Sequence, residues 1–241
     1  DSGYGSGITT YVATGNEYPV FNRLRDHTDS YRGGVRIERS RFHVTLELGG
    51  TAFKDDQSAS QDQRILGNRT SPLSGQQLAL NSLLQAYGIR GDSLYTRALV
   101  TAAPASWADL HGMFLFSQPS TDVRYSMNAA GLFVLPATLR FFTSGQDTLF
   151  ASAKQPHTSG SLSLDLRPLR RLRIVESWMT DRLHNASGAA LAEQIFFTPT
   201  SSSSLSELAA DRLIYNYSRQ QVDVFFDVLK RLTLRGGHRY V

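Results

Sequence analysis

The sequence predicts an all-β fold, an antiparallel up-and-down meander of about eight strands that forms part or all of a transmembrane β-barrel. Two observations lead to this prediction. Apolar and polar residues alternate with a period of two along several segments, and four places share one pattern in which two such segments flank a short turn. The turns are centred on Ser40, Ala105, Leu169 and Lys230, at intervals of 65, 64 and 61 residues, so the unit repeats almost regularly.

Composition excludes several other classes of protein. Of the 241 residues, 41% are hydrophobic and 19% are charged, which is not the composition of a disordered chain. The longest apolar clusters, such as Leu132 to Leu135, are far shorter than the ~18 residues of a membrane-spanning helix. The chain has no cysteine, so disulfides, thiolate metal sites and a cysteine nucleophile are excluded. Its net charge is +4, but basic residues are interspersed with acidic ones, and we expect no nucleic-acid partner.

We interpret residues 1–241 as one barrel segment that contains four hairpins. The hairpins are expected at about residues 30–53, 93–117, 158–182 and 213–241. Long loops are expected between them, at residues 54–92, 118–157 and 183–212, and leucines between Leu78 and Tyr87 indicate a short helix in the first loop.

Short turns on one side of a sheet and long loops on the other are typical of outer-membrane barrels. Because bilayer hydrocarbon offers no hydrogen bonds, such a sheet must close on itself, with apolar side chains toward lipid and polar ones toward the lumen. The expected lipid-facing residues are Val35, Ile37, Val44, Leu46, Leu110, Phe114, Leu164, Val224 and Phe226. The expected lumen-facing residues are Arg32, Arg36, Glu38, Glu47, Arg97, Asp109, Asp165, Asp223 and Arg235.

This pattern favours a passive function, as a pore or as a sleeve around a partner protein, and not an enzyme. No catalytic residue, metal ligand set or cofactor site is expected, because the six histidines are dispersed and no Gly-x-Ser-x-Gly motif is present. One alternative is a soluble extracytoplasmic β-sandwich for binding or adhesion, whose strands alternate in the same way. A barrel hydrolase is a second alternative, and a propeller or solenoid is disfavoured by the spacing of the turns.

Part of the chain resembles a known family. The segments Asn16–Val20, Leu24–Asp29, Tyr31–Val35 and Phe42–Glu47 resemble large outer-membrane β-barrel proteins of acidobacterial type, and more loosely the barrels that sheathe multihaem cytochromes. The resemblance covers about the first 55 residues. It implies an outer-membrane location in a Gram-negative-type bacterium and a chain that is a fragment of a wall of roughly twenty or more strands. A barrel closed by these strands alone remains the alternative.

The same resemblance bears on partners. It implies contact with outer-membrane lipid and passage of small polar solutes, or a separate periplasmic or cytochrome partner. The sequence contains no haem-attachment motif, so any cytochrome is expected to be a different chain. No catalytic residue is carried over from the family.

Overall fold

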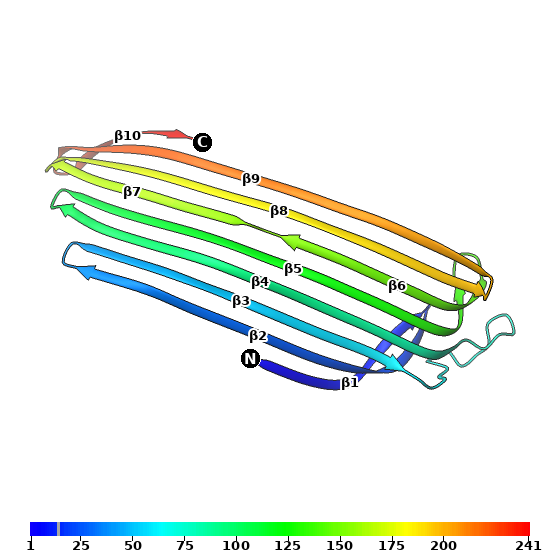
Figure 1. The fold of residues 1–241 in the computed structure, drawn as a ribbon. Coiled ribbons are helices and arrows are strands. Elements are labelled where there is room, and N and C mark those ends of the chain that lie inside the picture. Colours follow the sequence, from blue (N-terminus) through cyan, green and yellow to red (C-terminus); the bar gives the residue numbers. More distant parts are fainter. Residues whose placement is uncertain (14) are drawn as a thin grey trace.

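The computed structural model describes residues 1–13 and 15–241, and these form a single all-β sheet of ten antiparallel strands (Figure 1). Neighbours in the sheet follow the chain order, so the predicted antiparallel meander is confirmed. The described part contains no helix that could cross a membrane. The strands are β1 (Ser2–Ala13), β2 (Asn16–Arg39), β3 (Phe42–Gln61), β4 (Ala79–Ala105), β5 (Ala108–Leu135), β6 (Arg140–Lys154), β7 (His157–Leu169), β8 (Leu172–Thr198), β9 (Ser201–Leu229) and β10 (Leu232–Tyr240).

The four predicted turns are present, each two residues long. They are formed by residues 40–41, 106–107, 170–171 and 230–231, and all four lie at the same end of the sheet (Figure 1). We call this the turn end, and the opposite end the far end. Alternation of apolar and polar residues on both sides of each turn had located these hairpins, because side chains of a strand point to opposite faces in succession.

The three long loops predicted from the sequence are wrong. Residues 54–61 and 79–92 continue β3 and β4, and the helix expected after Leu78 is part of β4. Most of residues 118–157 and 183–212 is likewise strand, and the connections at the far end shrink to residues 62–78, 136–139 and 199–200. In these segments polar and apolar residues occur on both faces, so hydropathy no longer alternates regularly, although the ladder between β3 and β4 continues without a register shift.

The number of strands also differs from the prediction of eight. The N-terminal segment forms β1, which pairs with β2. The segment after residue 139 forms β6, which lies end to end with β7 between β5 and β8. At their junction the amide N–H of Gln155 donates to the Pro119 carbonyl (3.0 Å), and that of His184 donates to the Pro156 carbonyl (3.0 Å). The two short strands therefore occupy one position in the sheet.

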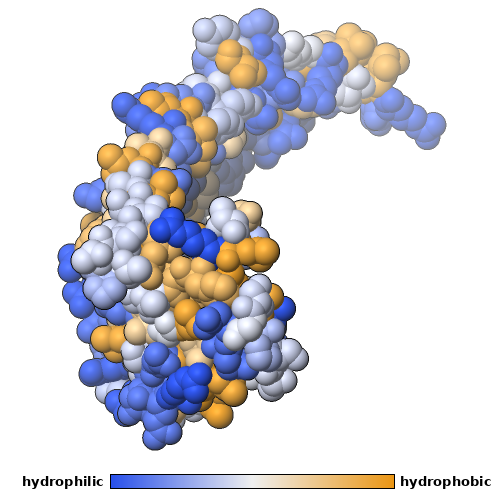
Figure 2. Space-filling model, turned by 90° about the vertical axis from the view of Figure 1, so that its right-hand side faces the viewer, coloured by the Kyte–Doolittle hydropathy of each residue, from blue (hydrophilic) through white to orange (hydrophobic). Residues whose placement is uncertain are grey.

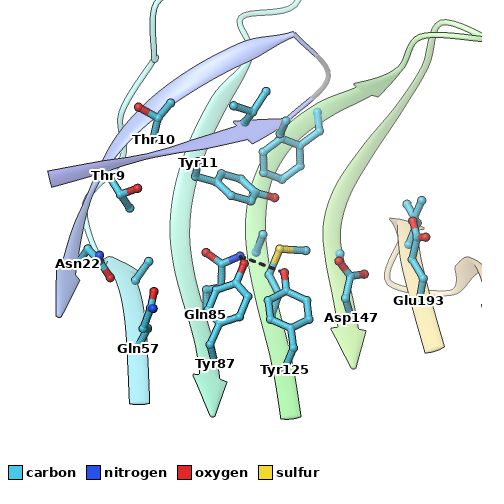
Figure 3. Close-up of a pocket in the computed structure, with 18 of the residues that line it drawn as sticks. Thr9, Thr10, Tyr11, Asn22, Gln57, Gln85, Tyr87, Tyr125, Asp147 and Glu193 are labelled. Atoms are coloured by element: carbon cyan, nitrogen blue, oxygen red, sulfur yellow. Dashed lines mark hydrogen bonds between the residues drawn. The ribbon is translucent and has the colours of Figure 1, made fainter. Parts of the chain in front are cut away.

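The sheet is strongly curved and open. Seen from the far end it forms an arc, with a convex outer face and a concave inner face (Figure 2). The strand order runs from β1 at one edge to β10 at the other, and the described residues include no pairing between these two strands. At the far end β1 crosses over the inner face of β3, β4 and β5 (Figure 3).

The buried core lies where β1 covers the sheet. Tyr18 and Phe133 are 0% and 1% exposed, and their rings meet edge to face with centroids 6.4 Å apart. Val20, Leu80 and Leu83 complete the main part of this cluster. Burial of these apolar side chains stabilises the packing of the β1–β2 hairpin against the inner face.

Asn16 connects this hairpin to the loop at residues 62–78. The side chain is fully buried, and its amide donates to the Tyr18 hydroxyl (2.8 Å) and to the Leu66 carbonyl (3.0 Å). Its Oδ1 accepts the backbone N–H of Arg69 (2.9 Å). Gly67 has a φ of 70°, and a Cβ there would lie 2.6 Å from the Asn16 Oδ1, so only glycine fits against this amide.

Candidate functional site

The pairing register assigns each strand residue to one face, because directly paired residues point to the same side. Val35 pairs with Leu46, Leu46 with Ala98, and Ala98 with Phe114. Extended across the sheet, this register places all the expected lipid-facing residues on the outer face. It places all the expected lumen-facing residues on the inner face. The sequence had therefore separated the two faces correctly.

The outer face near the turn end carries a continuous set of apolar side chains, which we call the apolar band. Its members include Phe114 and Phe226, which are 43% and 44% exposed although both are large and apolar. No second sheet packs on them among the described residues. The band comprises Val35, Ile37, Phe42, Val44, Leu46, Leu48, Leu94, Ala98, Val100, Leu110, Phe114, Phe116, Leu162, Leu164, Leu166, Ile174, Trp178, Val222, Val224, Phe226 and Leu234.

The apolar band crosses the strands obliquely. On β3 it runs from Phe42 toward the far end as far as Leu48, whereas on β9 it runs from Val222 toward the turn end as far as Phe226. Phe42 and Val222 belong to the same row of paired residues, so the centre of the band moves along the strands between β3 and β9. From the usual rise per residue and strand spacing, the shift corresponds to an angle of about 35° between the strands and the normal to the band. Strands of membrane barrels are tilted by about 35–45°.

Beyond the apolar band, toward the far end, the outer face becomes polar and charged. The last apolar row of paired residues contains Tyr31 and Leu94. The next row toward the far end contains Asp29 and Asp92, and the outer face is mostly polar from there on. The charged residues of this outer region are Arg23, Arg25, Asp29, Lys54, Asp56, Arg90, Asp92, Asp122, Arg124, Lys154, Arg182 and Arg212. β9 has 29 residues, while ~9–11 suffice to cross a bilayer, so the strands continue well past the band.

Glu176 interrupts the apolar band on β8. It pairs with Leu164 in regular register, so it lies on the outer face and no bulge turns it inward. Its carboxylate accepts a hydrogen bond from the Gln220 side chain (2.9 Å), also on the outer face. Trp178 follows one pair further along the strand and restores the apolar character.

The inner face opposite the apolar band carries charges that pair between strands. Asp165 on β7 binds Arg173 on β8, with 2.7 Å between Oδ2 and Nη2. Asp223 on β9 binds Arg235 on β10 in the same way (3.1 Å). Glu47 is paired with Arg97 across the ladder, and its carboxylate accepts a hydrogen bond from the Tyr95 hydroxyl (2.8 Å). These ion pairs hold the charged side chains against the inner face of the sheet, where they remain partly exposed to solvent.

The inner face of the far half is acidic. Between the level of Ser30 and the far-end connections, Arg140 at the start of β6 is the one Lys or Arg among the described strand residues of this face. The acidic residues are Asp26, Asp55, Asp147, Glu193, Glu207 and Asp211. Since the other basic strand residues of this half lie on the outer face, the two faces of one sheet carry opposite net charges there.

A cavity of about 620 Å³ lies in this acidic region, beneath β1 (Figure 3). Tyr11 contributes from β1, and Tyr87, Tyr125, Asp147 and Glu193 contribute from the sheet. Burial, reinforced by nearby Tyr125 and Asp147, raises the pKa of Tyr11 to about 12. Burial and then Glu193 raise the pKa of the Asp147 carboxyl above its usual value. Sequence reasoning missed Tyr87, Tyr125, Asp147 and Glu193 because it assigned their segments to loops. The polar and aromatic side chains at alternate positions, such as Gln85 and Tyr87, were a usable signal.

One His–Asp pair lies on the inner face. The closest approach to a triad is His157 Nε2 beside Asp181 Oδ1 (2.5 Å), with Ser117 directly opposite His157. No hydrogen bond joins a serine to His157 in the part of the chain that the structure describes. Over the same residues, no group of three or more His, Cys, Asp or Glu side chains could hold a metal ion. No protein-family model matches the chain, and no curated protein matches it significantly.

Proposed function

We propose that this chain is part of the wall of an outer-membrane β-barrel that acts as a passive pore or as a sleeve for a partner protein. The observation that carries the proposal is the apolar band on the convex face, exposed and without a packing partner in the described structure. A soluble β-sandwich would bury the same residues between two sheets. Large exposed apolar surfaces on proteins mark contact with another protein or with lipid.

The shape of the apolar band supports lipid as the contact. A protein partner would require a patch, whereas the band extends from β2 to β10 at a steady angle to the strands. Apolar outer-face residues of β4 reach from Leu94 to Ala102, which pairs with Phe42 and Leu110, and at the usual rise and the tilt above this corresponds to about 22 Å along the normal. The apolar band of a membrane barrel is about 25 Å tall.

The inner face supports a polar lumen. Its paired Asp165 and Arg173, and Asp223 and Arg235, would line the membrane level of a water-filled interior. The turn end would face the periplasm and the far end the cell exterior, since short turns are periplasmic in such barrels. Side chains on this face would then select solutes by charge and hydrogen bonding, without chemical change. In the sleeve version the same face would contact a periplasmic or cytochrome partner.

Cysteine scanning tests the membrane assignment, because the chain has no cysteine of its own. Single cysteines are placed in the apolar band (Val35→Cys, Phe114→Cys, Val224→Cys), on the inner face (Ser177→Cys), and on the outer face beyond the band (Ser152→Cys). The protein is reconstituted into liposomes and treated with a charged maleimide. We expect labelling at Ser177→Cys and Ser152→Cys and protection at the three band positions until detergent is added.

Equal labelling of all five positions, with the protein in the aqueous phase, would overturn the proposal in favour of a soluble domain. Planar-bilayer recordings then separate the two passive functions. A steady ohmic current indicates an open pore, and silent insertion, with specific retention of a periplasmic or cytochrome chain, indicates a sleeve.

A further inference from the structure

The cavity beneath β1 is built from distant parts of the chain. Its walls come from β1 and β2, from the inner faces of β3, β4 and β5, and from β6 and β8 beyond them (Figure 3). Its volume of about 620 Å³ lies within the range of small-molecule sites, which is ~300–1,000 Å³. It lies on the inner face of the far half, so a solute that enters the concave side from the far end reaches it before the level of the apolar band.

Aromatic rings with fixed orientation form part of the wall. The Tyr87 and Tyr125 rings, paired across β4 and β5, have centroids 4.6 Å apart and planes inclined by 38°. The Gln85 amide donates to both hydroxyl groups, at 3.0 Å each. Tyr11 reaches toward them from β1 (Figure 3). These contacts hold the rings in place, so little conformational entropy would be lost in ordering them when a ligand binds.

The polar lining offers hydrogen-bond donors and acceptors together. Asn22, Gln57 and Gln85 present side-chain amides, and Asp147 and Glu193, directly paired across β6 and β8, present carboxylates. The lining contains no Lys, Arg or His. An anionic ligand would meet two carboxylates and no positive charge, so anions are disfavoured.

We propose that this cavity binds a short neutral saccharide. Sugar hydroxyl groups both donate and accept, so they can use the amides, the phenol groups and the carboxylates at once. The apolar C–H faces of a sugar ring pack on aromatic rings, which are apolar on their faces and polar at the hydroxyl edge in tyrosine. An ammonium ion only donates, so it would offer no acceptor to the O–H groups of Tyr87 and Tyr125, which already accept from Gln85.

The inference does not depend on membrane insertion, because the cavity is complete within the described residues of β1 to β8. A soluble domain with the same fold would bind the same ligand. Failure of saccharide binding therefore leaves the barrel proposal standing, and the reverse also holds.

Calorimetric titration of the purified chain in detergent micelles tests the inference with named probes. The neutral probes are maltotriose, cellotriose and xylotriose, the cationic probe is spermidine, and the anionic probe is glucuronate. We expect at least one neutral trisaccharide to bind and the two charged probes not to bind. Binding of spermidine alone, or no binding of any neutral probe, overturns the proposal.

Two substitutions localise the site. Gln85→Met removes the amide that holds Tyr87 and Tyr125, and Asp147→Asn keeps the shape but removes a charged acceptor. We expect Gln85→Met to weaken trisaccharide binding at least tenfold and Asp147→Asn to weaken it severalfold. Gln146→Met is the matched control, since Gln146 neighbours Asp147 but lies exposed on the outer face. Undiminished binding by both variants would place the ligand elsewhere and contradict the assignment.

Discussion

The side chain of Asn16 accepts the backbone N–H of Arg69 at 2.9 Å, across 53 residues of sequence. Through this bond and its bonds to Tyr18 and Leu66, one buried amide joins the β1–β2 turn to the longest connection of the far end. β1 forms the roof of the cavity, so this contact holds the roof in place. The relationship leads to a first prediction.

Asn16→Ala should release the loop at residues 62–78. The change leaves three buried or half-buried polar groups without a partner, and we expect a loss of about 3 kcal/mol in the free energy of unfolding. Limited trypsin digestion should then cleave after Arg64 and Arg69 much faster than in the parent chain. Asn128→Ala, on the exposed outer face of β5, is the control and should not alter the digestion. Unchanged cleavage in Asn16→Ala would show that the loop is held by other contacts.

Gly49→Ala should disturb the inner face at the edge of the apolar band. A methyl group at Gly49 would lie 2.6 Å from the ring of Tyr95, which packs over it from β4. The ring must move and lose its hydrogen bond to Glu47, so we expect a destabilisation of about 1–3 kcal/mol. Gly33→Ala meets nothing within 4 Å and serves as control. Thermal unfolding in detergent micelles measures both, and equal stability of the two variants would contradict the prediction.

Glu176→Leu should stabilise the protein in a bilayer. The carboxylate lies within the apolar band, where a leucine would face hydrocarbon instead of a charge. We expect a gain of about 1–2 kcal/mol in lipid, where charges on the lipid face cost most near the midplane. In aqueous buffer the same change should give no gain and should promote aggregation. A stabilisation that is equal in lipid and in buffer would argue against the membrane assignment.

Asp147→Asn should stabilise the fold at neutral pH but not in acid. The pKa of Asp147 is raised from 3.8 in the folded state, first by burial and then by Glu193. The folded state therefore holds the proton more tightly, and stability falls as the pH rises from the ordinary pKa through the raised one. The stabilising effect of Asn should appear across this interval and vanish below pH 3.8. Denaturant titrations at several pH values measure it, and a pH-independent effect would contradict this cause.

Joint substitution Glu207→Gln and Asp211→Asn should reduce cation preference if the barrel conducts. Both residues lie on the acidic inner face of the far half. Their charges raise the local cation concentration, so the reversal potential in a salt gradient should move toward zero when they are removed. The shift should shrink at high salt, because the Debye length falls to ~3 Å at an ionic strength of about 1 M. Asp122→Asn on the outer face is the control, and an equal shift there would mean that the inner charges do not act on permeating ions.

The alternation of apolar and polar residues, legible in the sequence, was enough to predict the all-β meander, the four turns and the two faces. Val35 and Arg36 point to opposite sides because neighbouring side chains of a strand always do, so this information is local. The same reasoning failed at residues 54–61, where both faces are polar, and at residues 79–92, where leucines lie on both faces. In these segments backbone hydrogen bonds hold the strands together, and backbone hydrogen bonds do not depend on the hydropathy of the side chains.

Only the tertiary structure decided how β1 folds and what it encloses. Tyr11, Gln85, Tyr125 and Glu193 are far apart in the sequence, and they share a cavity because β1 crosses the inner face and the register aligns the rest. The fold of β1 depends in turn on the burial of Tyr18 against Phe133 and on the Asn16 contacts. The sequence alone therefore determined which side of the sheet each strand residue faces, a property of neighbouring residues. The cavity required contacts over long sequence separations, which no local pattern records.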